Sequence, residues 1–228
     1  MNEPSSLTLK EIRDEAGNIK TFVFETGGLE WTAGQYQTYA LPHDGVEASH
    51  DNEHWFTISS APSEGTVNIS TRLTGSAFKS ALAALQPGDT LSRYGIEGDF
   101  TWEDVSDERV VFVAAGIGVT PFRSILLERH LTDKPLNSTL LYFNRDDQIP
   151  FKETFDDLVA RHPEFTVTYV TGQPVTADKI LELAPEAASE TTYLSGPGPM
   201  VIAVGEELSG RGVTVKRDEF PGYTEQNY

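Results

Sequence analysis

The sequence contains no cysteine. This absence excludes disulfides, a thiol nucleophile, a cysteine-ligated iron–sulfur cluster and a cysteine-based zinc site within these residues. The five histidines show no metal-ligand spacing, so we expect no bound metal.

Basic residues are scarce. The chain has 17 lysines and arginines against 35 aspartates and glutamates, a net charge of −18. Nucleic acid is therefore not an expected partner, because the basic footprint that phosphates require is missing. The acidic excess indicates either a solvated surface or a surface that docks a basic partner. If an anionic nucleotide binds, the few cations near glycine turns matter more than usual.

Long apolar runs are also missing. No run approaches the roughly 20 residues that a membrane helix needs, so we expect no membrane span. The first six residues have neither the basic start nor the apolar core of a signal peptide. We therefore expect cytoplasmic residence.

The most informative segment that is present is a fully apolar run over 110–115, broken by Gly116 and Gly118 and followed by Thr120 and Pro121. Such a run indicates a strand buried on both faces. Proline suits the first turn of a helix. A strand, a glycine turn and a helix N-terminus form a site for a phosphate or the edge of a nucleotide. The third glycine of Gly-x-Gly-x-x-Gly is absent, so a turn without a ligand stays open.

The two halves of the chain differ in the order of their predicted strands and helices. Short strands, a hairpin and one helix predict an N-terminal antiparallel β-barrel over 1–103. Strands that alternate with helices predict an α/β parallel-sheet domain over 104–228. The expected barrel strands are 7–12, 19–26, 34–41, 54–59, 66–73 and 90–94, with a helix over 76–85. The expected strands of the second domain are 109–114, 138–143, 165–170, 192–195 and 213–217, and its helices lie near 121–130, 151–161, 176–183 and 200–209. Ligands of such sheets bind at the carboxyl ends of the strands.

A barrel followed by a nucleotide domain that opens with Gly-x-Gly-x-Thr-Pro resembles the ferredoxin–NADP reductase superfamily. The resemblance covers nearly the whole chain, from 31–36 to 220–223. It implies FAD on the barrel, NAD(P)H on the second domain, and hydride transfer from NAD(P)H to flavin N5.

The family's flavin motif is Arg-x-Tyr-Ser/Thr with a serine shortly after. The segment 54–60 resembles this motif but differs from it at two positions. His54 replaces the arginine and Phe56 replaces the tyrosine, which is similar to the His-Pro-Phe-Ser/Thr motif of ferric reductases and NADPH oxidases. The resemblance places Thr57 beside flavin N5, where a hydroxyl can donate as hydride arrives. A neutral histidine lacks the fixed charge of arginine, so flavin affinity is lower unless Arg72 supplies that charge. The cofactor-binding residues implied in this segment are His54, Trp55, Phe56, Thr57 and Ser60.

The segment that runs from Arg72 into the barrel helix resembles the family's second flavin-binding element. Its glycine turn leads into a helix N-terminus, whose amides can cradle a pyrophosphate, so FAD is expected rather than FMN. Arg72 and Lys79 add charge there, unless they are solvated surface cations. The implied binding residues are Arg72, Gly75, Ser76, Ala77 and Phe78.

In the second domain, the resemblance brings Gly116, Gly118, Thr120 and Pro121 to the nicotinamide nucleotide, and Asn144 and Arg145 to its adenosine half. Arg145 favours the 2′-phosphate of NADPH, whereas Asp146 and Asp147 suit the free ribose hydroxyls of NADH. Both donors stay open, with NADPH as our expectation.

The family's Cys-Gly-Pro-x-x-Met motif has its counterpart at Ser195, Gly196, Pro197 and Met200. Ser195 takes the place of the cysteine near nicotinamide C4, a change that replaces a soft sulfur by a hydroxyl. Near the end of the chain, Phe220, or else Tyr223, is the expected aromatic cover of the flavin, and Glu219 is a candidate proton relay.

The resulting hypothesis is an FAD-dependent NAD(P)H oxidoreductase that gives its electrons to a separate, unknown acceptor. One alternative is a free-flavin or ferric reductase with an exchangeable flavin. Another is a non-catalytic electron-transfer subunit that needs a partner.

Overall fold

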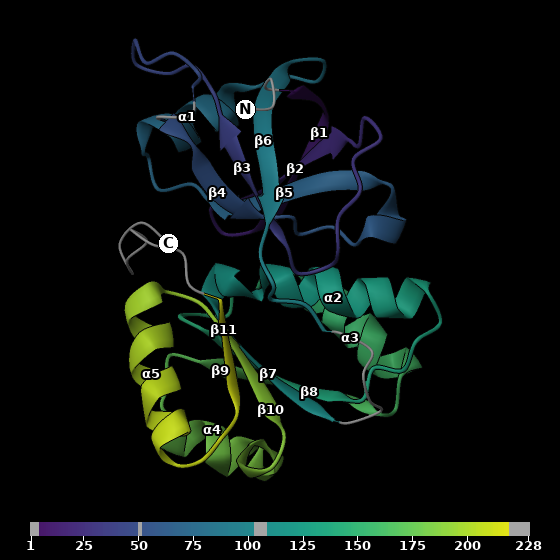
Figure 1. The fold of residues 1–228 in the computed structure, drawn as a ribbon, viewed down its shortest axis with the longest axis vertical. Helices are drawn as coiled ribbons and strands as arrows, with labels where there is room; N and C mark the ends of the chain where they lie inside the picture. The colour runs from purple at the N-terminus through teal and green to yellow at the C-terminus, as the bar shows by residue number, and fades with distance from the viewer. Residues whose placement is uncertain (1–4, 50–51, 103–108, 219–228) are drawn as a thin grey trace.

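The computed structural model describes residues 5–49, 52–102 and 109–218. It contains a six-stranded antiparallel sheet followed by a five-stranded parallel sheet with helices, which confirms the predicted fold class (Figure 1). Among these described residues, no helix is long and apolar enough to cross a membrane.

The N-terminal sheet has the strand order β4-β3-β6-β1-β2-β5. Its elements are β1 (Ser5–Ala16), β2 (Ile19–Glu25), β3 (Tyr36–Ala40), β4 (His54–Thr57), the 3₁₀ turn η2 (Pro62–Glu64), β5 (Thr66–Arg72), α1 (Ala77–Ala84) and β6 (Thr90–Glu97). The two outer strands meet through an antiparallel bridge between Ile58 and Ile69, which closes the sheet on itself. Alternate side chains point inward and fill the barrel with aromatic and branched residues, among them Leu7, Phe22, Phe24, Tyr39, Ile69 and Leu91.

The parallel sheet has the order β11-β10-β7-β8-β9. Its elements are β7 (Val110–Ala115), η3 (Gly116–Val119), α2 (Thr120–Leu131), β8 (Ser138–Asn144), α3 (Lys152–Arg161), β9 (Phe165–Thr171), α4 (Ala177–Leu183), η4 (Pro185–Ala188), β10 (Thr191–Ser195), α5 (Gly198–Gly210) and β11 (Val215–Asp218). The central strand β7 explains why the run is apolar without alternation. Phe112 packs toward α2 and α3, whereas Val111 and Val113 pack toward α4 and α5, so both faces are buried.

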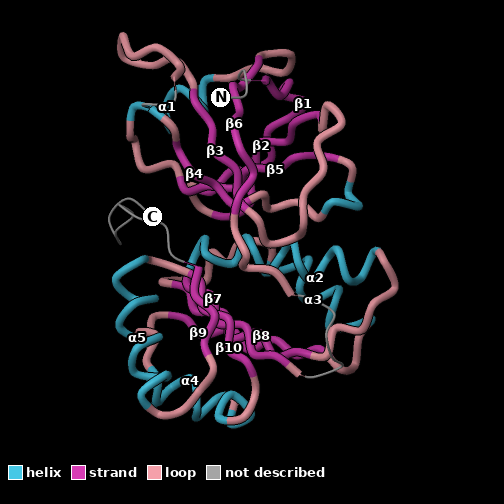
Figure 2. The backbone as a smooth tube through the Cα atoms, viewed as in Figure 1, coloured by secondary structure: helices cyan, strands magenta, loops and turns pink. Residues whose placement is uncertain are grey.

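The two domains meet along α2, which lies between the parallel sheet and the barrel (Figure 2). A close approach is built into this contact, because a Cβ at Gly34 would lie 3.0 Å from the Ile125 side chain of α2. The same helix begins directly after the glycine turn, so the turn and the domain contact share one rigid element.

Candidate functional site

A cavity of ≈ 570 Å³ lies at the carboxyl edge of the parallel sheet, where the sequence predicts a ligand. Five of its lining residues were expected to bind cofactors in the second domain or its turns: Gly116, Asn144, Arg145, Pro197 and Met200. Arg72, expected at the flavin, also lines it and is the contribution of the barrel. The other lining residues are Ala115, Ile117, Phe143, Gly172, Gln173, Pro174, Val175, Pro199, Ala203 and Val204.

The glycine turn packs directly against the loop that follows β10. A Cβ at Gly118 would lie 2.6 Å from the Gly196 Cα and 2.7 Å from the Ser195 carbonyl carbon. Gly116 adopts a left-handed φ of 57° at the cavity wall. The Thr120 hydroxyl donates to the Ile117 carbonyl at 3.1 Å, and Pro121 is buried. Of the four predicted turn residues, Gly116 therefore lines the cavity, and the other three shape the turn behind it.

Asn144 is buried at the end of β8, and its side chain holds the following loop. Its amide nitrogen donates to the carbonyls of Asp146 at 3.0 Å and Gln148 at 2.9 Å. Its side-chain oxygen is buried and has no hydrogen-bond partner among the described residues, and it lies about 4.0 Å from where a Cβ of Gly116 would stand. The cavity wall thus contains an acceptor that a bound hydroxyl or amine can satisfy.

Arg145 is exposed and lines the cavity, whereas the neighbouring carboxylates do not line it within the described part of the chain. The Asp146 carboxylate accepts the backbone N–H of Gln148 at 3.0 Å, so it serves its own loop. The cavity of this acidic protein is therefore lined by two arginines, Arg72 and Arg145, and by no described carboxylate.

Ser195 is fully buried and donates its hydroxyl hydrogen to Asp218 at 2.8 Å. Burial raises the pKa of the Asp218 carboxyl to about 7, and the Ser195 hydrogen bond opposes that rise. Sequence reasoning missed Asp218 and proposed Glu219 instead. Glu219, Phe220 and Tyr223 lie outside the described residues.

The predicted flavin segment forms an aromatic group on the barrel. The His54 ring stacks on Phe78 with centroids 3.9 Å apart, and Phe56 stacks on the same ring at 5.8 Å. Burial first, and then His43 and Lys79, lower the pKa of His54, so its ring is neutral at pH 7. Thr57 is buried at the end of β4, whereas the Trp55 side chain is 39% exposed on the outside.

The second predicted flavin element lies at the start of α1. The Ser76 side chain accepts from the Lys79 backbone N–H and caps the helix, and Gly75 has a left-handed φ of 77°. Ala77 begins the helix, and Lys79 is buried. Burial first, and then the nearby Arg72, lower the Lys79 pKa to about 8. The Arg72 guanidinium also donates to the Asn18 side chain at 2.8 Å.

Ser60 makes hydrogen bonds both to the barrel and to α2. Its hydroxyl accepts from the Asn68 backbone N–H at 3.0 Å, and its carbonyl accepts from the Ser124 hydroxyl at 2.6 Å. The Ser60 side chain is fully buried.

Part of the cavity was not predicted residue by residue. The segment 172–175 lines it, although the sequence indicated only that β9 ends beside a glycine. The glycine that follows a buried strand was the available signal, because the ends of parallel strands share one edge.

Comparison with known proteins agrees with this arrangement. The oxidoreductase NAD-binding domain family matches residues 112–206. A flavohemoprotein of Burkholderia sp. (strain TH2) is 26% identical over 207 residues, which cover 84% of this chain and 51% of that protein. Ferredoxin–NADP reductase B of Sorangium cellulosum (strain So ce56) is 29% identical over 212 residues, which cover 89% of this chain and 82% of that protein. The chain spans about half the length of the flavohemoproteins that it matches.

Solved structures share the fold. The crystal structure of a ferredoxin NADP+ reductase from Neisseria gonorrhoeae with bound FAD and NADP has a TM-score of 0.78 and 14% identity, covering 96% of this chain and 99% of that one. The flavohem-like FAD/NAD-binding domain of nitric oxide dioxygenase from Vibrio cholerae has a TM-score of 0.79 and 21% identity, covering 94% and 98%.

Proposed function

We propose that this chain, which is similar to the ferredoxin–NADP reductase-like superfamily of FAD- and NAD(P)-binding oxidoreductases, is an FAD-dependent NAD(P)H reductase that serves a separate acceptor. The observation that carries this proposal is the cavity at the sheet edge, to which the barrel contributes Arg72. A nucleotide held there would meet the barrel at Arg72, which is part of the second predicted flavin element.

The barrel residues fit FAD. Lys79 is buried near Arg72 at the N-terminal end of α1, so two cations lie beside the first amides of this helix. A pyrophosphate would be held there by the amides that follow Gly75 and by Lys79 and Arg72. When bound, FAD supplies the conversion between two-electron and one-electron transfer.

The other predicted site residues would orient the reactants and exclude water. Thr57 would hold its hydroxyl toward flavin N5, and Phe56, Phe78 and His54 form the apolar wall that keeps water away. Ser195 would face the nicotinamide from the opposite domain, with its hydroxyl hydrogen directed to Asp218. These groups align the reactants, and the electron chemistry belongs to the cofactors.

Replacing Lys79 by methionine should weaken FAD binding about 10-fold or more, because a charge-assisted hydrogen bond contributes about 1.5–3 kcal/mol. The wild-type affinity should also fall as the pH rises through about 8, since the apoprotein ammonium loses its proton there. A bound phosphate raises the pKa of that ammonium, so binding takes up protons above pH 8. Fluorescence titration of the apoprotein with FAD measures both effects.

The matched control is Lys10→Met, which removes an exposed lysine of β1. Its FAD affinity should equal that of the wild type at each pH. A Lys79→Met protein with unchanged affinity would remove Lys79 from the flavin site.

For the donor, the cavity lining favours NADPH. Arg145 lines the cavity and Asp146 is engaged by its own loop. Arg145→Ala should lower the ratio of kcat/KM for NADPH to that for NADH about 10-fold, by loss of a guanidinium–phosphate contact. Arg161→Ala, which removes an exposed arginine of α3 that does not line the cavity, serves as the control. A ratio that is unchanged in Arg145→Ala would point to a donor chosen elsewhere.

A free-flavin or ferric reductase is the second candidate. It is favoured by His54, which offers no fixed cation because its ring is neutral and stacked on Phe78. A non-catalytic electron-transfer subunit is the third. Reduction of an artificial acceptor by NADPH, with and without added FAD, separates them. Activity that needs no added FAD supports the proposal; activity only with excess FAD indicates an exchangeable flavin; bound FAD without activity indicates a subunit.

A further inference from the structure

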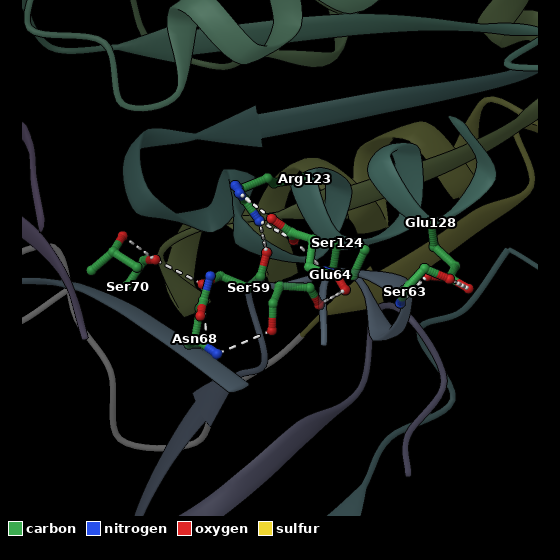
Figure 3. A network of polar contacts seen from close by, with 11 residues as sticks. Ser59, Ser63, Glu64, Asn68, Ser70, Arg123, Ser124 and Glu128 are labelled. Atoms are coloured by element: carbon green, nitrogen blue, oxygen red, sulfur yellow. Dashed lines mark hydrogen bonds and ion pairs between the residues drawn. The ribbon is translucent and has the colours of Figure 1, made fainter. Parts of the chain in front are cut away.

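A set of buried polar contacts joins the two domains immediately after Thr57 (Figure 3). Arg123 of α2, 8% exposed, donates from Nη1 to the Ser59 carbonyl at 2.7 Å. The next residue, Ser124, donates its hydroxyl hydrogen to the Ser60 carbonyl at 2.6 Å. These two carbonyls follow Thr57 by two and three residues, and α2 begins directly after the glycine turn. One helix therefore holds both the nucleotide turn and the end of the flavin segment.

The Arg123 guanidinium is fixed in its plane. It makes a two-pronged ion pair with Glu64, at 2.8 Å from Nη1 to Oε2 and 3.0 Å from Nη2 to Oε1. Glu64 is held in turn by the Ala61 backbone N–H at 2.7 Å. The Phe151 ring lies 5.2 Å from the guanidinium carbon. A paired fork of this kind specifies orientation as well as distance.

The same segment is also held from inside the barrel. The Ser59 backbone N–H donates to the Asn68 carbonyl at 2.9 Å, and its hydroxyl lies 2.7 Å from the Ser70 hydroxyl. Ser70 continues the chain to Thr21 at 2.7 Å. Residues 59 and 60 are thus hydrogen-bonded to β5 on one side and to α2 on the other. These contacts restrict movement of Thr57 relative to the glycine turn.

We propose that Arg123 is a positioning residue that fixes the distance between the nucleotide and the flavin through Ser59. This inference rests on the proposed function. A buried ion pair contributes little net stability compared with apolar groups of the same volume, so its value lies in the geometry that it specifies. Hydride transfer needs the reacting atoms about 3–3.5 Å apart, and a misplacement of about 1 Å costs about 100-fold in rate.

The kinetic test is stopped-flow reduction of the FAD-loaded protein by saturating NADPH. Arg123→Met, an apolar replacement, should lower the reduction rate constant about 10- to 100-fold. The dissociation constants of FAD and of NADP⁺ should stay within about threefold, and Arg123→Lys should restore part of the rate. The control is Glu128→Gln on the same helix, whose contacts with Ser63 lie at the exposed rim of the same interface. It should stay within about twofold of the wild type.

A second test needs no cofactor. Because the chain has no cysteine, Lys10→Cys on β1 and Glu206→Cys on α5 allow one spin label in each domain. Pulsed electron–electron double resonance of the labelled apoprotein measures the distance between the two labels. The distance distribution should be narrow in the wild-type background and in Glu128→Gln, and broad or shifted in Arg123→Met. Should Arg123→Met not fold, Glu64→Gln breaks the ion pair while keeping an acceptor, and the same broadening is expected.

The outcomes separate the two claims. An unchanged distance distribution together with an unchanged reduction rate in Arg123→Met or Glu64→Gln would overturn the positioning role. A wild-type protein that NADPH does not reduce would instead refute the proposed function, whatever the labels report.

Discussion

Replacing Gly118 by alanine should weaken NADP⁺ binding about 10- to 100-fold, the equivalent of the roughly 1–3 kcal/mol that overpacking costs. The new methyl carbon would lie 2.6–2.7 Å from backbone atoms of Gly196 and Ser195. Neither loop can yield cheaply, because a Cβ at Gly196 would itself lie 2.5 Å from Met200 and 2.8 Å from the Ala115 Cβ. The two turns would therefore separate, and with them the residues on both sides of the cavity.

Isothermal titration with NADP⁺ measures this effect on the folded protein. Gly210→Ala is the matched control, since a Cβ there meets nothing within 4 Å and α5 ends at that residue. Gly210→Ala should bind like the wild type. If Gly118→Ala also bound within about threefold, the close contact between the turns would not shape the nucleotide site.

Asp218→Asn should raise the free energy of unfolding at pH 8 by about 4 kcal/mol. Burial raises the pKa of Asp218 to about 7 in the folded protein, whereas the unfolded chain titrates near ~3.9. The contribution of this raised pKa to stability is fully present below about pH 4 and is lost as the pH rises through 7. Above pH 7 the wild type carries a buried carboxylate, which asparagine replaces by a neutral group of the same shape.

Urea unfolding of the apoprotein at pH 5 and pH 8 checks the sign. The gain from Asp218→Asn should be large at pH 8 and small at pH 5, while the exposed Asp147→Asn should show no such difference. Equal gains at both pH values would mean that Asp218 is ionised throughout, so that its carboxylate permanently accepts from Ser195.

Most of the fold could be predicted from the sequence because the hydrophobic periodicity of each element agrees with the burial of its side chains. The uninterrupted apolar run of β7 predicts burial on both faces, and Phe112 and Val113 do pack on opposite sides. Ser76 predicts the start of α1, and its side chain does cap that helix.

The contacts that could not be predicted from the sequence are those between residues far apart in the chain. Arg123 and Glu64 are 59 residues apart, and no local pattern relates them. Asp218 and Glu219 are adjacent carboxylates in the sequence, which alone does not indicate that Asp218 accepts a hydrogen bond from Ser195. The commitment of the Ser60 hydroxyl to Asn68 likewise depends on how β4 and β5 meet.

The most direct test of the central claim is the visible spectrum of the FAD-loaded protein under anaerobic conditions, before and after one equivalent of NADPH. The account predicts flavin absorption near ~450 nm that is lost within a single turnover, and more slowly with NADH. A protein that shows no flavin band once unbound FAD has been removed, or whose flavin band persists with both nucleotides, would contradict it.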